Sequence, residues 1–253
     1  MMKIILSGCN GSMGQVITKL VQKSDDAKIV CGLDISTQAN NGYPVFDDLF
    51  DCDAAADVII DFSHPAALSK VLKYAVDKKI PVVVATTGLS KEQLGTLDSA
   101  AESVPVFFSA NMSLGINLII DLAAKAAQLL EDSFDIEIIE KHHNQKIDAP
   151  SGTALMIADA ISDSLNKSPE YVYDRHSVRK KRDKNEIGIH AIRGGTIVGE
   201  HTVLFSGQDE VIEIHHSAAS KEVFGVGAYK AAKFLVGKPN GMYNMKDLVN
   251  SKQ

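Results

Sequence analysis

The feature that most restricts the fold is a glycine-rich loop near the start of the chain, between an apolar strand and an amphipathic helix. The predicted strand covers residues 3–7, and a G-x-x-G-x-x-G pattern follows over residues 8–14. Apolar residues then recur at positions 13, 16, 17, 20 and 21, the spacing of one helix face. A second predicted strand, residues 28–33, ends directly before Asp34, 20 residues after Gly14. This order of elements predicts a dinucleotide-binding βαβ unit.

Each part of this loop suits a pyrophosphate. Glycines let the backbone turn tightly and approach the phosphates, and the new helix offers free N–H groups and a positive dipole end. The carboxylate of Asp34 can accept hydrogen bonds from ribose hydroxyls. The alternative is an ordinary glycine turn, but that alternative does not account for the flanking elements and the acid. We therefore expect a nucleotide site here.

The alternation of strands and helices continues to about residue 112. Strands are predicted over residues 56–62, 80–85 and 104–109, and helices over residues 68–76 and 90–102. The second helix begins with a capping-box pattern, Ser90 with Gln93. Polar residues follow the strand ends: Asp34, Ser63, His64, Thr86, Thr87 and Asn111. This pattern predicts a doubly wound parallel sheet that binds its ligand at the carboxyl ends of the strands. For His64 alone, a surface role is as plausible as a ligand contact.

The second half has a different character. A helix that is apolar nearly all round is predicted over residues 114–130, and a strand over residues 135–140. Alternating, β-branched segments over residues 186–193, 196–206 and 210–218 predict a mixed or antiparallel sheet. A last helix over residues 220–236 could belong to either domain. The fold class is therefore α/β, with a Rossmann-type doubly wound parallel sheet and a second α+β domain.

Composition excludes several classes of function. The net charge of −6 disfavours non-specific nucleic-acid binding. The apolar runs fall short of the roughly 18 residues of a membrane helix, and Gly8 follows the start too soon for a signal peptide. Cys9, Cys31 and Cys52 are odd in number and lack metal-binding spacing, which is typical of reduced thiols in the cytoplasm.

The densest cluster of titratable residues lies in residues 140–154, EKHHNQKIDAPSGTA, on a predicted strand-to-helix connection. A histidine with a pKa of about 6.5 suits a general acid near neutral pH, and a lysine can hold a carboxylate or help donate a proton. The N–H groups and hydroxyls of Ser151, Gly152 and Thr153 form an anion site at the helix start. These residues predict a nicotinamide-dependent reductase of a small, dicarboxylic substrate.

Other interpretations of these patterns remain open. A metal site is disfavoured because adjacent histidines on an extended segment point to opposite sides and no H-E-x-x-H pattern accompanies them. The cluster could also be a polar loop satisfied internally. A second pair, His215 and His216, is expected to place one ring in the core and one at the surface. The basic residues between positions 168 and 185 form either a solvated loop or a basic lid that attracts an anionic substrate.

Residues 140–154 also closely resemble the signature of the dihydrodipicolinate reductase family, also called 4-hydroxy-tetrahydrodipicolinate reductases, of the diaminopimelate route to lysine. The resemblance runs from end to end of the chain. It includes residues 8–14, 85–88, 109–112, 189–195, 199–203 and 227–232. This long signature is far more specific than a glycine loop alone.

The resemblance implies an NAD(P)H-dependent oxidoreductase that delivers hydride to the substrate ring, with loss of the 4-hydroxyl as water and tetrahydrodipicolinate as product. His142 would be the proton donor and Lys146 a second catalytic group. The substrate would be contacted by His143, Gly152, Thr153 and Arg193. The cofactor would be lined by Gly8, Cys9, Asn10, Gly11, Ser12, Met13, Asp34, Ala85, Thr86, Thr87, Ser109, Ala110, Asn111 and Met112.

The resemblance also implies an organisation. Residues 1–112 and 220–253 would form the dinucleotide-binding domain, with the last helix returning to it. Residues 113–219 would bind substrate and join a homotetramer. No metal, membrane or nucleic acid is expected. A reductase of another imine or keto dicarboxylate, or a non-catalytic NAD(H)-binding sensor, are the alternatives, although the intact residues 142–153 argue against both.

Two departures from the family pattern bear on the cofactor. Ala85 stands where a glycine is common, which narrows the expected nicotinamide pocket. Asp34 is followed by Ile35, Ser36 and Thr37, without an arginine or lysine to balance a 2′-phosphate. We therefore predict a preference for NADH over NADPH.

Overall fold

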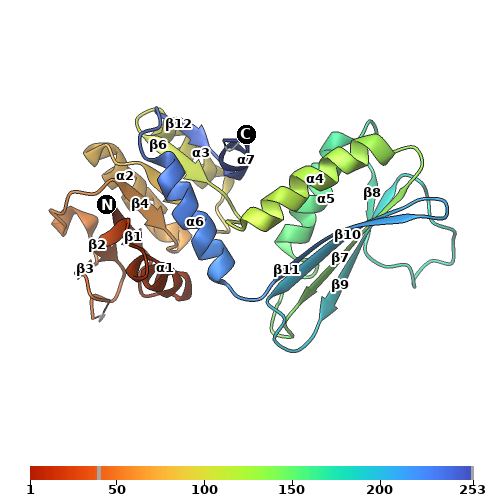
Figure 1. The fold of residues 1–253 in the computed structure, drawn as a ribbon, viewed down its shortest axis with the longest axis horizontal. Helices are drawn as coiled ribbons and strands as arrows, with labels where there is room; N and C mark the ends of the chain where they lie inside the picture. Colours follow the sequence, from red (N-terminus) through yellow and green to blue (C-terminus); the bar gives the residue numbers. More distant parts are fainter. Residues whose placement is uncertain (39–40, 252–253) are drawn as a thin grey trace. The chain divides into compact units, whose positions relative to one another are not determined.

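The computed structural model describes residues 1–38 and 41–251, and the chain divides into two compact units (Figure 1). The first unit comprises Met1–Leu114 and Lys221–Gln253, and the second comprises Gly115–Ser220. The second unit is therefore one continuous segment between the two parts of the first.

The first unit is built on a seven-stranded parallel sheet of order β12-β6-β5-β4-β1-β2-β3. Its strands are β1 (Met2–Ser7), β2 (Ala27–Leu33), β3 (Val45–Phe46), β4 (Val58–Asp61), β5 (Val82–Val84), β6 (Pro105–Phe108) and β12 (Gly241–Tyr243). The strand order reverses between β1 and β4, and ligands of open α/β sheets bind at such a switch point.

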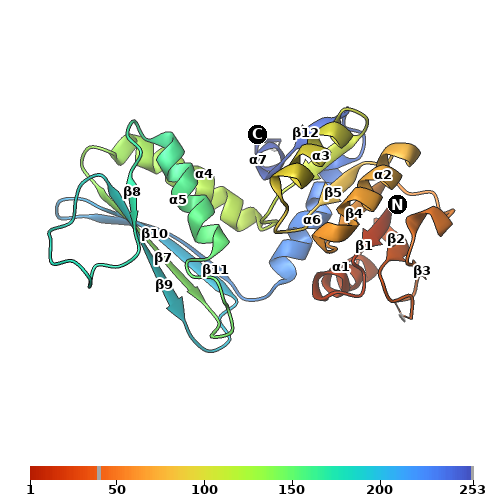
Figure 2. The ribbon, with the colours of Figure 1, turned by 180° about the vertical axis from the view of Figure 1, so that it is seen from behind.

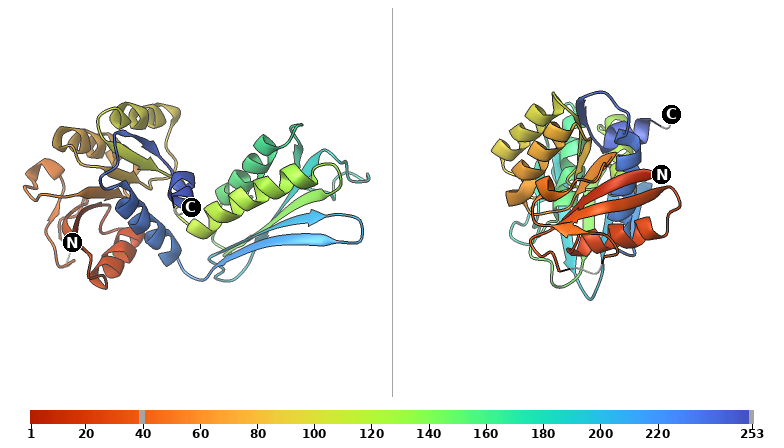
Figure 3. Two further views of the ribbon diagram at one scale, coloured as in Figure 1. Left: turned by 45° about the horizontal axis from the view of Figure 1, so that its top comes forward. Right: turned by 90° about the vertical axis from the view of Figure 1, so that its left-hand side faces the viewer.

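Helices cover both faces of this sheet (Figure 3). The helices are α1 (Ser12–Gln22), α2 (Leu68–Lys78), α3 (Lys91–Ala101), α6 (Glu222–Leu235) and α7 (Met245–Asn250), with short 3-10 turns at Leu49–Asp51 and Pro65–Ala67. Neighbouring residues of β1 enter different cores, because successive strand side chains point to opposite faces. Ile4 packs in the core of α1, α6 and α7, whereas Ile5 packs in the core of α2 and α3. Burial on both faces explains why the central strands are continuous apolar runs.

The second unit has a mixed five-stranded sheet of order β11-β10-β7-β9-β8. Its elements are α4 (Leu114–Leu130), whose first residue belongs to the first unit, β7 (Asp135–His142), α5 (Gly152–Ser164), β8 (Glu170–Val172), β9 (Glu186–Arg193), β10 (Gly199–Ser206) and β11 (Val211–Ala218). β7 runs parallel to β9 and antiparallel to β10. Helices α4 and α5 pack on one face of this sheet (Figure 2), where Ile138, Ile157 and Phe205 share the core.

The predicted fold class is confirmed, with some differences in detail. β7 continues to His142, two residues beyond the predicted strand, so this histidine lies on the sheet and not in the connecting loop. The elements β3, β8, β12 and α7 were not predicted, because each is too short for a hydrophobic period to emerge. Within the described residues, no helix is long and apolar enough to cross a membrane.

Candidate active site

The glycine loop of the first unit makes the tight turn that its sequence predicts. Gly8 has φ +75°, and an added Cβ would lie 2.7 Å from the carbonyl oxygen of Phe62. Both facts require glycine at this position. Helix α1 then begins at Ser12 with Gly11 as its N-cap, and its first turn contains no acidic residue. The loop therefore offers backbone N–H groups to an anion.

A cavity of about 730 Å³ lies beside this loop, at the carboxyl ends of β1, β2 and β4. Of the predicted cofactor residues, Gly8, Asn10, Gly11 and Asp34 line it. The Asn10 backbone N–H donates to Asp34 Oδ2 at 2.9 Å, which fixes this carboxylate at the wall. The Ser7 hydroxyl is buried and has no hydrogen-bond partner among the described residues. The glycine loop, the wall carboxylate and this orphaned hydroxyl fit a nucleotide.

Three charged residues of the cavity wall were not predicted: Asp47, Asp48 and Lys70. The two acids follow β3, which pairs in parallel with β2, so the strand-end rule could have found them had the two-residue strand been recognised. Lys70 comes from α2 and is remote from Asp34 in sequence. The cavity wall thus includes a cation, although the residues directly after Asp34 supply none.

The other predicted cofactor residues lie at neighbouring strand ends, and several are buried. Thr86, after β5, donates through Oγ1 to Asp61 Oδ2 at 2.8 Å. Ser109, after β6, donates through its hydroxyl to the carbonyl of Asn111 at 2.8 Å. Cys9 is completely buried in a hydrophobic core, so it offers no surface to a ligand. Ala85 and Met112 also pack in that core.

The polar cluster of the second unit is assembled by the sheet register. His142 is paired with Arg193 of β9, and Glu140 with His201 of β10. Along β7, Ile136, Ile138, Glu140 and His142 are buried and alternate with more exposed residues. The face that forms the apolar core thus continues into a polar end, closed by the start of α5.

Glu140 is the centre of this polar end, with no exposed surface. Its carboxylate accepts hydrogen bonds from His142 Nδ1 at 2.6 Å and from the Ser151 backbone N–H at 2.9 Å. Arg193 donates to both oxygens, through Nη1 at 2.8 Å and Nη2 at 2.7 Å. Burial raises the pKa of Glu140, but these hydrogen bonds outweigh it and leave the pKa below its ordinary value. Glu140 is therefore ionised at neutral pH.

The second ring nitrogen of His142 faces Gly199 of β10. A Cβ added to Gly199 would lie 3.1 Å from His142 Nε2, so glycine keeps the space beside this nitrogen open. The His201 ring contacts the His142 ring edge-on, with centroids 5.2 Å apart. Burial lowers the pKa of His201 to about 4, so it stays neutral beside His142. Sequence reasoning missed Glu140, Gly199 and His201 as site residues.

The start of α5 lies directly against this cluster. The Ser151 hydroxyl caps the helix by accepting from the Ala154 N–H at 3.2 Å, and it also bonds His201 Nε2 at 3.2 Å. Gly152 is exposed at the first helical position. Thr153 follows and is partly buried.

The connecting loop before α5 carries the other predicted residues. Lys146 Nζ pairs with Asp148 Oδ1 at 2.8 Å, and this contact is the main cause that lowers the pKa of Asp148. His143 follows the end of β7 and is partly exposed. The second unit thus brings His142, His143, Lys146 and Arg193 to the same end of the sheet. Within residues 1–38 and 41–251, no group of three His, Cys, Asp or Glu side chains is arranged to hold a metal ion.

Comparison with known families decides the assignment. The N-terminal family model of dihydrodipicolinate reductase matches residues 2–112, and the C-terminal model matches residues 115–249. The chain belongs to the dihydrodipicolinate reductase family. A nicotinamide dinucleotide is the cofactor that this Rossmann-type family implies.

Relatives of similar length support membership of the dihydrodipicolinate reductase family. Proteins named 4-hydroxy-tetrahydrodipicolinate reductase are 56% identical in Caldanaerobacter subterraneus subsp. tengcongensis, over 98% of both chains, and 51% identical in Clostridium novyi, over 100% of both. A solved structure described as dipicolinate-bound dihydrodipicolinate reductase from Paenisporosarcina sp. TG-14 aligns with a TM-score of 0.81 at 24% identity, covering 96% of this chain and 97% of that one. That last similarity shows the shared fold.

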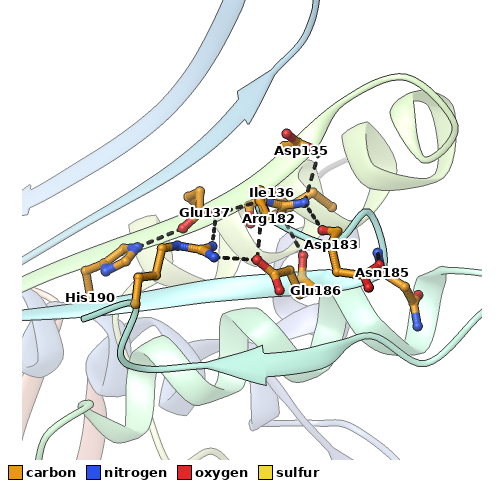
Figure 4. Close-up of polar contacts among 9 residues, drawn as sticks. Asp135, Ile136, Glu137, Arg182, Asp183, Asn185, Glu186 and His190 are labelled. Carbon is orange, nitrogen blue, oxygen red and sulfur yellow. Dashed lines mark hydrogen bonds and ion pairs between the residues drawn. The ribbon is translucent and has the colours of Figure 1, made fainter. Parts of the chain in front are cut away.

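The basic residues between positions 168 and 185 are partly neutralised by carboxylates of the second unit's sheet (Figure 4). Those on β7 lie on the face opposite Glu140 and His142. Arg182 donates to Glu137 Oε1 at 3.0 Å and to Asp135 Oδ1 at 2.9 Å. Arg175 binds Glu137 at 2.5 Å and also pairs with Glu186. Two of the arginines expected in a solvated loop or basic lid therefore hold the segment onto β7 and β9.

Proposed function

We propose that this protein catalyses the NAD(P)H-dependent reduction of 4-hydroxy-tetrahydrodipicolinate to tetrahydrodipicolinate, with loss of water, in the diaminopimelate route to lysine. The observation that carries the proposal is a histidine held by a buried carboxylate beside a helix start, in a chain of the dihydrodipicolinate reductase family. Family membership supplies the substrate class, and the site supplies the groups that this chemistry needs.

The cofactor would be held by the glycine loop and by the strand ends that follow it. Gly8, Asn10 and Gly11, with the first turn of α1, would bind the pyrophosphate, and Asp34 would accept from the adenosine ribose. Thr86 and Thr87 after β5, and residues 109–112 after β6, would line the nicotinamide end. When bound, the reduced nicotinamide supplies the hydride.

His142 would supply the proton. Because Nδ1 is engaged by Glu140, Nε2 beside Gly199 is the nitrogen that carries the transferable proton. The imidazolium donates from Nε2 and keeps the Nδ1 proton, so the ring becomes neutral without turning. Lys146 would assist protonation and binding once its contact with Asp148 loosens.

The substrate carboxylates would be held at the start of α5. Ser151, Gly152 and Thr153 stand where a helix N-terminus attracts an anion, and His143 and Lys146 add donors from the connecting loop. Arg193 was expected near the substrate, but both of its Nη atoms bind Glu140. We therefore assign its influence to Glu140 and not to a substrate contact.

We further propose that NADH is preferred over NADPH. Among the described residues of the cavity wall, three are carboxylates, Asp34, Asp47 and Asp48, and one is a lysine, Lys70. A 2′-phosphate placed beside Asp34 would meet like charge, and Lys70 offsets only part of it.

We also propose that the protein is a homotetramer, that it acts in the cytoplasm, and that the second unit binds the substrate. These three points are supported by the family resemblance. Light scattering of the purified protein tests the tetramer.

The decisive experiment generates the substrate in situ from pyruvate and aspartate semialdehyde with the preceding synthase. Oxidation of NADH and of NADPH is then followed separately by absorbance. We expect rapid oxidation that needs both protein and substrate, with the larger kcat/KM for NADH. An advantage of NADPH by about tenfold or more, roughly 1.4 kcal/mol, would refute the cofactor proposal alone.

The same assay separates the alternatives. If neither cofactor is oxidised although NADH binds, the reaction proposal fails. Screening other imine and keto dicarboxylates would then distinguish a reductase of another substrate from a non-catalytic NAD(H) sensor.

A further inference from the structure

We propose that Glu140 is the positioning residue for His142, fixing which ring nitrogen is free to donate, and that Arg193 limits how strongly Glu140 attracts the proton. The proposal rests on the proposed role of His142 as proton donor. It assigns a function to two residues that need not touch the substrate.

The hydrogen bonds at Glu140 show which nitrogen of His142 carries a fixed hydrogen. Each carboxylate oxygen has two donors: Ser151 N and Arg193 Nη2 at Oε1, and His142 Nδ1 and Arg193 Nη1 at Oε2. An ionised carboxylate only accepts, and about four lone-pair sites are available. Nδ1 of His142 must therefore carry a hydrogen. The tautomer is fixed, and the proton that comes and goes is on Nε2.

Burial makes this contact strong. Glu140 is fully buried and His142 is 9% exposed, so water screens their interaction little. The ring is also held by its edge-on contact with His201. The carboxylate thus fixes both the orientation of His142 and the stability of its charged form.

Arg193 partly neutralises the negative charge of Glu140. Its guanidinium is fixed by the Asp148 carbonyl at 2.6 Å and the Ile192 carbonyl at 2.8 Å, so it cannot turn away from the carboxylate easily. A cation bound to both oxygens reduces the attraction that Glu140 exerts on a second cation. Glu140 without Arg193 would hold the imidazolium more tightly and release its proton less readily.

Among the described residues, the titratable and charged groups near His142 include Glu140 on β7, His143 directly after it, Arg193 on β9, His201 on β10 and His216 on β11. Lys146 and Asp148 add charges from the loop before α5. His201 is neutral at neutral pH, and Lys146 and Asp148 pair with each other. Glu140 and Arg193 therefore dominate, with opposite signs.

The test exploits that opposition. We expect the imidazole of His142 to hold its proton less tightly in Glu140→Gln and more tightly in Arg193→Gln, because the first change removes an anion beside the ring and the second removes a cation. The titration is followed by NMR of the imidazole, assigned by the signal missing in His142→Gln. Glu200→Gln is the matched control, because it removes the same charge from the Lys141 pair on the opposite face of the sheet, and should leave this titration unchanged.

Steady-state kinetics give a second readout. In Glu140→Gln, kcat should fall by about tenfold or more while KM for the substrate changes little, and the pH profile of kcat/KM should move in the same direction as the NMR titration. Equal or same-direction shifts in Glu140→Gln and Arg193→Gln would overturn the proposal, since a merely structural pair gives no opposed signs.

Failure to fold leaves the test intact. If circular dichroism shows that Glu140→Gln is unfolded, the Arg193→Gln titration decides alone, and an imidazole that holds its proton no more tightly than in wild type refutes the proposal. If that variant also unfolds, Arg193→Lys, which keeps the charge but loses the two-pronged contact, should give a smaller effect of the same sign. Full activity of His142→Gln would instead refute the proposed proton donor and leave the NMR result standing.

Discussion

The two ring nitrogens of His142 have unlike surroundings, and this difference determines which nitrogen can exchange a proton with a ligand. Nδ1 lies against a buried carboxylate at 2.6 Å, whereas Nε2 lies beside a glycine that leaves space. A proton can be exchanged with a ligand only on the second side. The neighbouring Ser151 to Thr153 segment offers hydrogen-bond donors that suit binding more than proton transfer.

This division predicts different kinetic effects for two substitutions. His142→Gln should lower kcat by about a hundredfold or more, the usual contribution of a general acid. Thr153→Val keeps the side-chain volume but removes a hydroxyl, so it should mainly raise KM. Steady-state kinetics with the generated substrate measure both, with the exposed His176→Gln as control. Near wild-type kcat in His142→Gln would show that the proton donor is misassigned.

Sequence reasoning selected as candidates the residues whose chemistry is visible in their type, such as His142, Lys146 and Asp34. It did not find Glu140 as a site residue, although Glu140 and His142 are two positions apart on one strand. The predicted strand stopped at Glu140, so the pleat that puts both side chains on one face was not applied. Lys70 and His201 gave no local signal, because each is distant in sequence from the other residues of its site.

The strand β7 carries two separate charge clusters on its two faces. Glu140 and His142 face the helices, whereas Asp135 and Glu137 face outward and bind Arg182. Arg182 also donates to the backbone carbonyls of Ile136 and Glu186, so one side chain ties the basic segment to two strands. The segment is thus held by electrostatics and hydrogen bonds more than by apolar packing.

We therefore expect Arg182→Gln to reduce stability in a pH-dependent way. Burial raises the pKa of Glu137, but hydrogen bonds from His190 and Arg182 outweigh it and lower the pKa overall. The stabilisation is complete above the unfolded value of about 4.3 and is lost as pH falls through the folded value. The melting temperature of wild type should exceed that of the variant at pH 7. The gap should narrow as pH falls below the unfolded value of about 4.3, and the bonds of Arg182 to backbone carbonyls should keep part of it.

Lys181→Gln is the control, because Lys181 is an exposed neighbour with the same charge. A gap between wild type and Arg182→Gln that is constant over the pH range would contradict the assignment to Glu137.

At the level of elements, sequence periodicity predicted the long helices and strands well. It failed for β3 and β8, whose two and three residues take their conformation from the neighbouring strand.

The two units have separate hydrophobic cores, and each unit holds one half of the predicted chemistry. The cavity with Asp34 lies in the first unit, and the cluster around Glu140 lies in the second. The alternating pattern of residues 1–112 predicted the first sheet. The sequence of the last helix alone could not assign it to one of the two units, because an apolar face is compatible with packing against either core.

Cofactor binding should therefore be detectable in the first unit alone. With NADH and no substrate, we expect slower hydrogen exchange at the N–H groups of residues 10–14, because the start of α1 gains an anionic partner. Residues 140–154 should change much less. Mass spectrometry of peptides from both units makes the measurement, with inorganic phosphate as control. Protection confined to residues 140–154 would contradict the placement of the cofactor.

The alternating faces of β7 also restrict how this enzyme can change over evolutionary time. Deleting or inserting a single codon within residues 136–141 would turn the inner side chains outward and the outer ones inward at one stroke. Such a change would put Lys141 or Ile139 where Glu140 stands, and would lose the Arg182 contacts as well. A point substitution changes one face of this strand and leaves the other intact, whereas a change of length alters both faces. Natural variants should therefore differ here in amino-acid identity and not in strand length.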